Sequence, residues 1–184
     1  MKTETLKQGA LKVLMIILTV AYGMMAYEAK AQTGTTNQDK MKPLLGWVGE
    51  WKGEGWSIDA SRQRTEFTVS ENIQPKLEGR ILLAEGIGKA KSTGQEGFHA
   101  FGVFYYNEQA KTYEVKSWLN DGNMSLSKAE INEQGQFIWG FQVPGGRIRY
   151  TITLTDTTWN EKGEFVMESG QAFPVMEMNL TKVK

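Results

Sequence analysis

The side chains that could act as catalysts or as ligands of a metal are few in this sequence. His99 is the only histidine among 184 residues, and cysteine is absent. A usual zinc site needs several His, Cys or carboxylate ligands, and one axial histidine gives little support for haem. No Gly-x-Ser-x-Gly motif supplies the sharp turn that carries a hydrolase's serine nucleophile. We therefore expect no enzyme, no metal and no cofactor, with haem binding or a hydrolase that uses His99 as the less favoured alternatives.

Acidic residues occur close together, which is an arrangement that general acid–base catalysis can use. The two pairs are Glu50 with Glu54 and Glu66 with Glu71. Both pairs fall in segments where polar and apolar residues alternate, so we expect them on solvated strand faces. Lysine plus arginine and aspartate plus glutamate number 21 each and form no basic stripe, which makes nucleic acid a poor partner.

A second set of side chains could orient a small molecule inside a barrel. It combines charged or hydrogen-bonding groups with aromatic rings on the same predicted strands. The alternation places these cavity candidates at Arg64, Glu85, His99, Tyr105, Trp118, Trp139, Phe141 and Tyr150. The aromatic members could line a pocket or fill it, and an arginine beside Glu85 would give a buried charge its partner.

Trp118 has two interpretations. It shares a strand face with Glu114 and Lys116, opposite Tyr113 and Val115. If Tyr113 and Val115 face the core, Trp118 points outward unless a bulge intervenes. We expect such a bulge, or a place at the barrel mouth, with packing on the outer surface as the open alternative.

These candidates need a scaffold, and the stretch Leu44–Trp56 is where it begins. Trp47, Trp51 and Trp56 occur there together with several glycines, which permit close backbone approach beside large apolar rings. Around its start, Met41, Leu44, Leu45 and Val48 have a spacing that one or two helical turns entered at Pro43 would place on one face. We expect a short helical plug followed by the first strand.

The rest of the chain alternates with a period of two residues and is interrupted by turns. A strong hairpin turn signal occurs at Asn120–Asn123, and further breaks between strands are expected at Asn132–Gly135, Pro144–Gly146 and Glu161–Gly163. About ten strands with short connections leave no room for crossover helices. The sequence therefore predicts an all-β, antiparallel, closed barrel, because closure removes exposed sheet edges.

The N-terminal 31 residues have the features of a secretory signal. Lysines precede the apolar run 13–21, and Ala29 and Ala31 are the small residues that a signal peptidase accepts. The run is too short to span a membrane, although an uncleaved N-terminal anchor is the alternative. We expect a signal peptide over 1–31, a flexible leader over 32–40 and a barrel domain over 41–184. Without cysteine the product is no lipoprotein, so we expect a soluble periplasmic or extracellular protein.

Several short motifs resemble known barrel families. Gly49-Glu50-Trp51 resembles the Gly-x-Trp of lipocalins and wider calycins, which implies a barrel floor in which Lys182 lies over Trp51. Four further segments look like a bacterial family of unknown function with a lipocalin-like barrel: Gly97–Asn107, Lys111–Tyr113, Ser117–Asp121 and Met176–Met178. The barrel is more distantly similar to nitrobindin and fatty-acid-binding proteins. The sequence lacks the C-terminal histidine of nitrobindin and the Arg-x-Tyr of the fatty-acid-binding proteins, so neither ligand is carried over.

The sequence thus favours an exported, non-enzymatic barrel that binds a small apolar or amphipathic molecule in its interior. The alternative is a filled barrel that serves as an interaction or structural module of the cell envelope. Neither the ligand nor the oligomeric state can be derived from these patterns.

Overall fold

The computed structural model describes residues 36–184 except Ala60, and these residues form ten strands and three short helices. Each strand in the order of the chain has the following bounds: β1 Gly49–Ile58, β2 Arg64–Lys76, β3 Ile81–Ala90, β4 Glu96–Asn107, β5 Thr112–Leu119, β6 Met124–Ile131, β7 Phe137–Val143, β8 Gly146–Leu154, β9 Thr158–Met167 and β10 Ala172–Lys182. The expected signal peptide lies outside the described residues.

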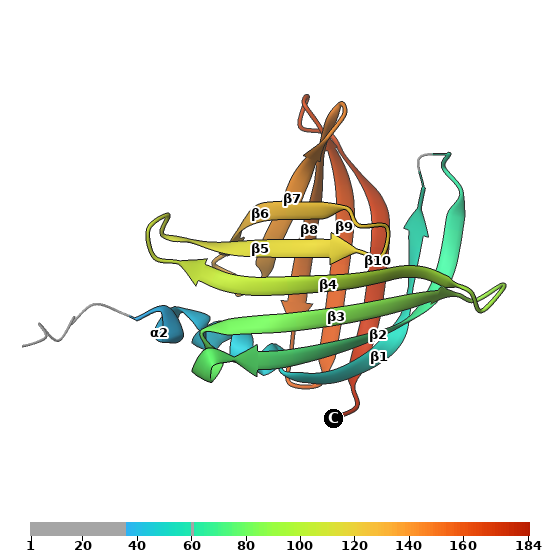
Figure 1. Cartoon of the computed structure of the whole chain (residues 1–184). Coiled ribbons are helices and arrows are strands. Elements are labelled where there is room, and N and C mark those ends of the chain that lie inside the picture. The colour runs from blue at the N-terminus through green and yellow to red at the C-terminus, as the bar shows by residue number, and fades with distance from the viewer. Residues whose placement is uncertain (1–35, 60) are drawn as a thin grey trace, which may run out of the picture. The chain divides into compact units, whose positions relative to one another are not determined.

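The ten strands pair antiparallel with their neighbours in the sequence and close into a barrel (Figure 1). Closure comes from β1, which pairs with β2 on one side and with β10 on the other. Most turns are a few residues long, so each strand pairs antiparallel with the strand before it. The predicted fold, an antiparallel lipocalin-like barrel, is confirmed.

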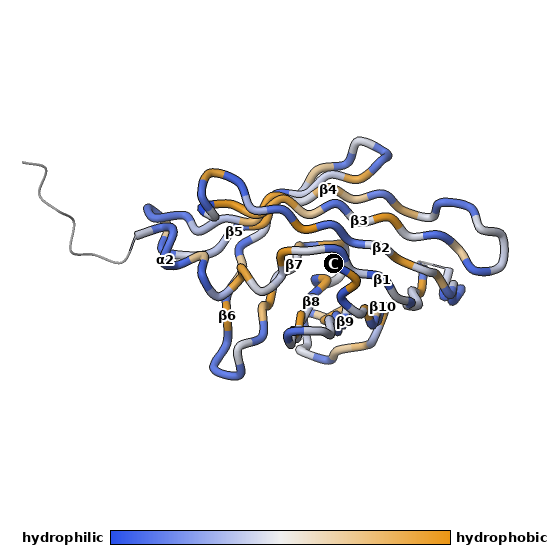
Figure 2. Tube along the Cα trace, turned by 90° about the horizontal axis from the view of Figure 1, so that it is seen from below, coloured by the Kyte–Doolittle hydropathy of each residue, from blue (hydrophilic) through white to orange (hydrophobic). Residues whose placement is uncertain are grey.

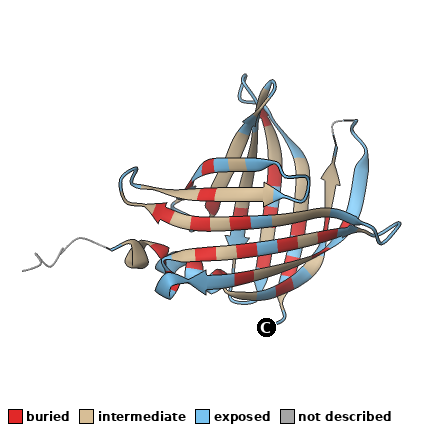
Figure 3. Cartoon of the chain, in the orientation of Figure 1, coloured by how far each residue is buried: buried red, intermediate tan, exposed pale blue. Residues whose placement is uncertain are grey.

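Alternation along the strands separates the interior of the barrel from its outer wall. Hydrophobic and hydrophilic residues follow one another along the sheet (Figure 2), and buried positions recur in the same way (Figure 3). Successive residues of a strand point to opposite faces, so one set of each strand enters the core. The core contains Trp51, Phe67, Val69, Ile73, Leu82, Phe104, Val115, Phe137, Ile152, Trp159, Met178 and Leu180.

One end of the barrel is closed by the segment α2 (Asn37–Met41) and the 3-10 helix η1 (Lys42–Trp47). Thr36 caps α2, and its side chain and that of Asp39 form a reciprocal capping box. Trp47 is only 3% exposed, and its ring lies 5.0 Å from Phe137 and 5.3 Å from Trp159, measured between ring centroids. The plug therefore fills the floor of the barrel with an indole.

The plug begins at Asn37, within the segment 32–40 that was expected from the sequence to be a flexible leader. The side-chain amide of Asn37 donates to the carbonyl of Tyr106 at 2.6 Å, and the Tyr113 hydroxyl donates to the carbonyl of Lys40 at 2.6 Å. These hydrogen bonds attach residues 37–40 to the barrel. Within the part of the chain that is described, no helix has the length and apolar character needed to cross a membrane.

Candidate functional site

The wall of the barrel is incomplete between β6 and β7. These strands pair only over Ala129–Ile131 and Phe137–Trp139, whereas β7 pairs with β8 over its whole length. Beyond Ala129 and Trp139 the two strands separate, so residues 124–128 of β6 have no partner on the β7 side. The wall of the barrel thus has a lateral opening, apart from the end that the plug closes.

Gly140 accounts for the direction in which β7 leaves β6. A Cβ atom on Gly140 would lie 2.1 Å from the carbonyl oxygen of Ile148 on β8. Only glycine permits this close approach of two backbones. At Gly140, the residue after its last pair with β6, β7 remains paired with β8. The opening therefore lies between β7 and β6.

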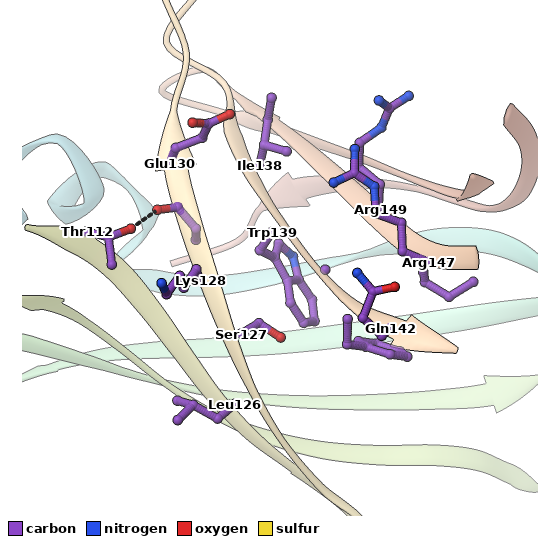
Figure 4. Close-up of a pocket in the computed structure, with 14 residues that line it drawn as sticks. Thr112, Leu126, Ser127, Lys128, Glu130, Ile138, Trp139, Gln142, Arg147 and Arg149 are labelled. Carbon is purple, nitrogen blue, oxygen red and sulfur yellow. Dashed lines mark hydrogen bonds between the residues drawn. The ribbon is translucent and has the colours of Figure 1, made fainter. Parts of the chain in front are cut away.

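A pocket of about 710 Å³ occupies the opening (Figure 4). Consecutive residues of both strands line it, among them Leu126, Ser127 and Lys128 of β6 and Gly140, Phe141 and Gln142 of β7. Since consecutive strand residues point to opposite faces, a pocket lined by both sets passes through the wall. Its volume falls within the range of about 300–1,000 Å³ that small-molecule sites occupy.

Aromatic side chains form the inner end of this pocket. Trp139 lines it and stacks on Tyr150, with ring centroids 4.6 Å apart and ring planes at 23°. Phe141 lies beside both rings, at 6.5 Å from Trp139 and 6.2 Å from Tyr150. Trp139, Phe141 and Tyr150 are the sequence-predicted cavity residues that the structure brings together on the inner face.

Buried polar atoms at the inner end have no hydrogen-bond partner of normal geometry among the described residues. They are the indole Nε1 atoms of Trp139 and Trp159 and the hydroxyl of Ser127. A buried donor without a partner costs stability, so such atoms call for a water molecule or a ligand group. Ser127 lines the pocket and is only 3% exposed, which places its hydroxyl where a ligand could reach it.

Glu161 on β9 lies among these groups. It is 5% exposed, and burial raises the pKa of its carboxyl group to about 7. The nearby indole N–H groups of Trp159 and Trp139 act in the other direction and lower this pKa, although neither makes a well-formed hydrogen bond. Burial in turn raises the pKa of Tyr150 to about 12, and the charge of Glu161 adds to that rise.

Glu71 on β2 is the second carboxyl group of the interior. Burial, and then repulsion from Glu161, raise its pKa to about 8. Its side chain remains partly accessible to solvent even though protein atoms crowd round the carboxyl group, as expected of a group that lines internal space. Gly86 on β3 provides room for it, because a Cβ atom there would lie 2.3 Å from Glu71 Oε1.

Sequence reasoning missed both interior carboxylates. Glu71 was expected on a solvated face, but it follows Phe67 and Val69 on the inner face of β2. Glu161 was expected in a turn at Glu161–Gly163, but these residues lie within β9. The alternation of Trp159, Glu161 and Gly163 was the signal that could have found it.

Four of the polar cavity candidates lie on the outer wall instead. The residues next to them in β2, β3 and β4 face inward, so the alternation of each strand places these four outside: Arg64, Glu85, His99 and Tyr105. His99 Nε2 lies 2.8 Å from Glu85 Oε1 on this outer surface. Tyr105 donates its hydroxyl hydrogen bond to Glu114. Arg64 lies over the ring of Trp56, with 4.3 Å between the guanidinium carbon and the ring centroid.

Trp118 also lies on the outer wall. The pairing of β5 with β4 and with β6 continues through Trp118 without a register shift, so the expected bulge is absent from this strand. Its ring lies 6.1 Å from that of Phe101 and 5.1 Å from the Lys116 ammonium. Trp118 therefore packs on the outer surface, which is the alternative that the sequence left open.

The barrel floor contains Gly49, Trp51 and Lys182. Trp51 pairs directly with Lys182 across β1 and β10, and the Lys182 ammonium lies 5.1 Å from its ring centroid. The Trp51 N–H donates to the carbonyl of Trp47 at 2.8 Å. Gly49 has a φ of 137°, and a Cβ atom there would lie 2.3 Å from the carbonyl oxygen of Lys184.

Comparison with solved structures finds the same architecture at very low sequence identity. Rv2717c from M. tuberculosis superposes with a TM-score of 0.61 and 8% identity, over 78% of this chain and 97% of that one. The S-type phycobiliprotein lyase CPES from Guillardia theta superposes with a TM-score of 0.52 and 12% identity, over 76% and 89% of the two chains. The likeness shows a shared barrel fold.

No protein-family model matches the chain, and no curated protein matches it. The resemblance to a bacterial family of unknown function therefore stays a prediction, as does the distant similarity to nitrobindin and fatty-acid-binding proteins.

Proposed function

We propose that this protein is a non-enzymatic barrel that binds a small amphipathic molecule, which enters between β6 and β7. The observation that carries the proposal is the pocket through the wall, with aromatic rings and unpartnered polar atoms at its inner end. An apolar pocket with a few convergent polar groups is the usual form of a small-molecule site.

The chemistry at the pocket favours binding over catalysis. Among the described residues, no group of three His, Asp or Glu side chains could hold a metal. His99 lies on the outer wall beside Glu85, away from the pocket between β6 and β7. Ser127 therefore has no histidine base beside it, as a nucleophilic serine would require.

The alternative, a filled barrel that acts as an interaction module, accounts for fewer observations. Exposed apolar residues do lie on the outer wall, and Leu126 is 59% exposed. Leu126 also lines the pocket, however, so its exposure fits an apolar approach to the opening. A filled barrel gives no reason for the gap in the wall. The likeness to a phycobiliprotein lyase concerns the fold and does not enter this choice. Export of the protein, expected from the leader, is part of the proposal.

A fluorescence titration of the full chain with the neutral probe N-phenyl-1-naphthylamine tests the proposal. The probe gains fluorescence when it enters an apolar site, so the wild-type protein should give a saturable rise. Ser127→Leu places extra methyl groups at the inner end of the pocket and should weaken binding by about tenfold. Thr68→Leu, on the outer face of β2 and outside the pocket, is the matched control and should bind like wild type.

Absence of saturable binding to the wild-type protein would overturn the proposal. Equal affinities of the wild-type and Ser127→Leu proteins would overturn the assignment of the β6–β7 pocket. Thermal unfolding of both variants shows that the comparison is made on folded protein.

A further inference from the structure

We propose that the ligand is an organic cation, an amine or quaternary ammonium compound with an apolar body, whose charged nitrogen is bound by Glu161 and Glu71. This inference rests on the proposed ligand-binding function and names the class of molecule that the site takes.

The first support is the imbalance of charge inside the barrel. Glu71 and Glu161 face the interior from β2 and β9, and no described lysine or arginine forms an ion pair with either carboxyl group. The lysines and arginines of the described strands lie at outward positions, apart from Lys182. That ammonium lies over Trp51 and approaches the carbonyl of Gly46 at 3.3 Å, at the floor of the barrel. When both carboxyl groups ionise, no basic side chain of the described residues pairs with them, and a bound cation would supply the countercharge.

The second support is the aromatic surface around the carboxylates. Trp159 lies beside Glu161 on β9 and contacts Trp51 edge to face, with ring centroids 5.8 Å apart. Trp139, which lines the pocket, stacks on Tyr150, and both side chains interact with Glu161. The face of an aromatic ring attracts a cation, most strongly where water is excluded. Acidic groups together with aromatic rings in one interior thus match an ammonium group better than a neutral or anionic one.

The third support is the position of Trp139. Its ring lines the pocket, and its N–H group lies near enough to Glu161 to lower the pKa of that carboxyl group. Together with the N–H of Trp159, it stabilises the ionised form of Glu161. Burial outweighs these two N–H groups and leaves the pKa of Glu161 at about 7, so a cation that lies against Trp139 is next to a carboxyl group that ionises near neutral pH.

The outer rim of the pocket does not supply the same selectivity. It carries Lys128, Glu130 and Arg147, a mixture of both signs. Arg149 is neutralised by Glu164, with Nη2 2.7 Å from Oε2. Recognition of the charged nitrogen thus falls to the inner end of the site, where both ionisable side chains other than Tyr150 are acidic.

The pH dependence of binding follows from the titration of the two acids. Their pKa values of about 7 and about 8 mean that both ionise as the pH rises through this range. Among the described residues, the two acids affect each other, the charge of Glu161 acts on Tyr150, and the inward-facing Lys182 lies over Trp51 at the floor. A cation with a permanent charge should therefore bind more tightly, with release of protons, as the pH rises.

The test compares two probes of the same shape on the full chain. Benzyltrimethylammonium carries a permanent positive charge, and neopentylbenzene has carbon in place of the nitrogen. Each competes with N-phenyl-1-naphthylamine, whose own binding reports on the proposed function. At about pH 9 the ammonium compound should bind about tenfold more tightly than its neutral isostere, and this preference should vanish at about pH 5.

Glu161→Gln should remove most of the preference while binding of N-phenyl-1-naphthylamine persists. Glu71→Gln should reduce the preference as well, which guards against a folding defect in one variant. Glu54→Gln is the matched control, because Glu54 is exposed and paired with Lys91 on the outer wall. The change of preference with pH in the wild-type protein needs no variant at all.

Binding of N-phenyl-1-naphthylamine without any preference for the ammonium compound would overturn this inference and leave the proposed function standing. The same holds if Glu161→Gln and Glu71→Gln both retain the full preference. Failure of all three probes to bind would overturn the proposed function itself.

Discussion

The carboxyl group of Glu71 lies over Gly86 on the neighbouring strand, so close that any side chain on Gly86 would have to displace it. A Cβ atom there would lie 2.3 Å from Oε1 and 2.6 Å from Oε2 of Glu71. Glycine within a strand ordinarily weakens it, and it is found where another group approaches the backbone. Gly86 thus gives an acidic side chain a place inside the barrel.

We predict that Gly86→Ala lowers stability through Glu71. The added methyl group must displace the Glu71 carboxyl group, since the three nearest atoms to the new Cβ all belong to that side chain. The cost should be on the order of 1–3 kcal/mol. In the background of Glu71→Ala the same substitution should cost much less, and a double-mutant cycle by urea unfolding measures the difference.

Gly97→Ala is the control for that cycle. A Cβ atom on Gly97 meets no atom closer than 3.8 Å, so the substitution should be nearly neutral in both backgrounds. Additive effects of Gly86→Ala and Glu71→Ala would contradict the placement of the carboxyl group over Gly86.

The two interior carboxyl groups should make stability depend on pH. Their pKa values of about 8 for Glu71 and about 7 for Glu161 lie above the ordinary value of 4.5. The folded protein therefore holds protons that the unfolded chain has already released, and stability present below pH 4.5 is lost as the pH rises through these values. The midpoint of thermal unfolding should fall between about pH 5 and about pH 9.

Glu161→Gln should flatten this dependence, because glutamine carries no charge at any pH. The flattening should amount to on the order of 3 kcal/mol at most, since one pKa unit corresponds to about 1.4 kcal/mol. Glu54→Gln should fall as steeply as wild type. Parallel curves for wild type and Glu161→Gln would show that Glu161 ionises freely and is not buried.

The indoles of the first strand and the plug should differ sharply in their contribution to stability. Trp47 is buried among Phe104, Phe137 and Trp159, so Trp47→Ala should cost about 3–5 kcal/mol. Trp56 lies on the outer wall under Arg64, so Trp56→Ala should cost about 1 kcal/mol. Urea unfolding measures both, and equal costs would contradict the plug as the floor of the barrel.

Hydrogen exchange should reveal the opening in the wall. Residues 124–128 of β6 are paired only with β5, whereas β9 is paired on both sides over most of its length. Amides of 124–128 that point towards β7 should exchange much faster than those of 159–163. Exchange measured by mass spectrometry on peptides covering both segments tests this, and equal protection would indicate that β6 and β7 are paired in solution.

The sequence predicts the barrel well because its signals are local. Alternation and turns recur from Arg64 to Leu154, and the Trp-rich stretch marks the first strand and the plug. Which residues of a strand face inward is harder to predict, because a single bulge would exchange the inward and outward sets of residues. For Trp118 that bulge was expected, and the continuous register of β5 shows that it is not there.

The candidate site depends on features that no local pattern contains. Glu161-Lys162-Gly163 has the composition of a turn, but pairing with β8 and β10 holds it in a strand. The gap between β6 and β7 arises where Gly140 approaches Ile148, a contact between residues of different strands. Tertiary contacts of this kind override local propensity.

A crystal structure of the full chain with N-phenyl-1-naphthylamine tests the central claim, binding through the wall of the barrel, most directly. The account predicts the probe between β6 and β7, with its rings against Trp139 and near Ser127. A probe bound on the outer wall beside Phe101 and Trp118, with the β6–β7 pocket empty, would contradict it.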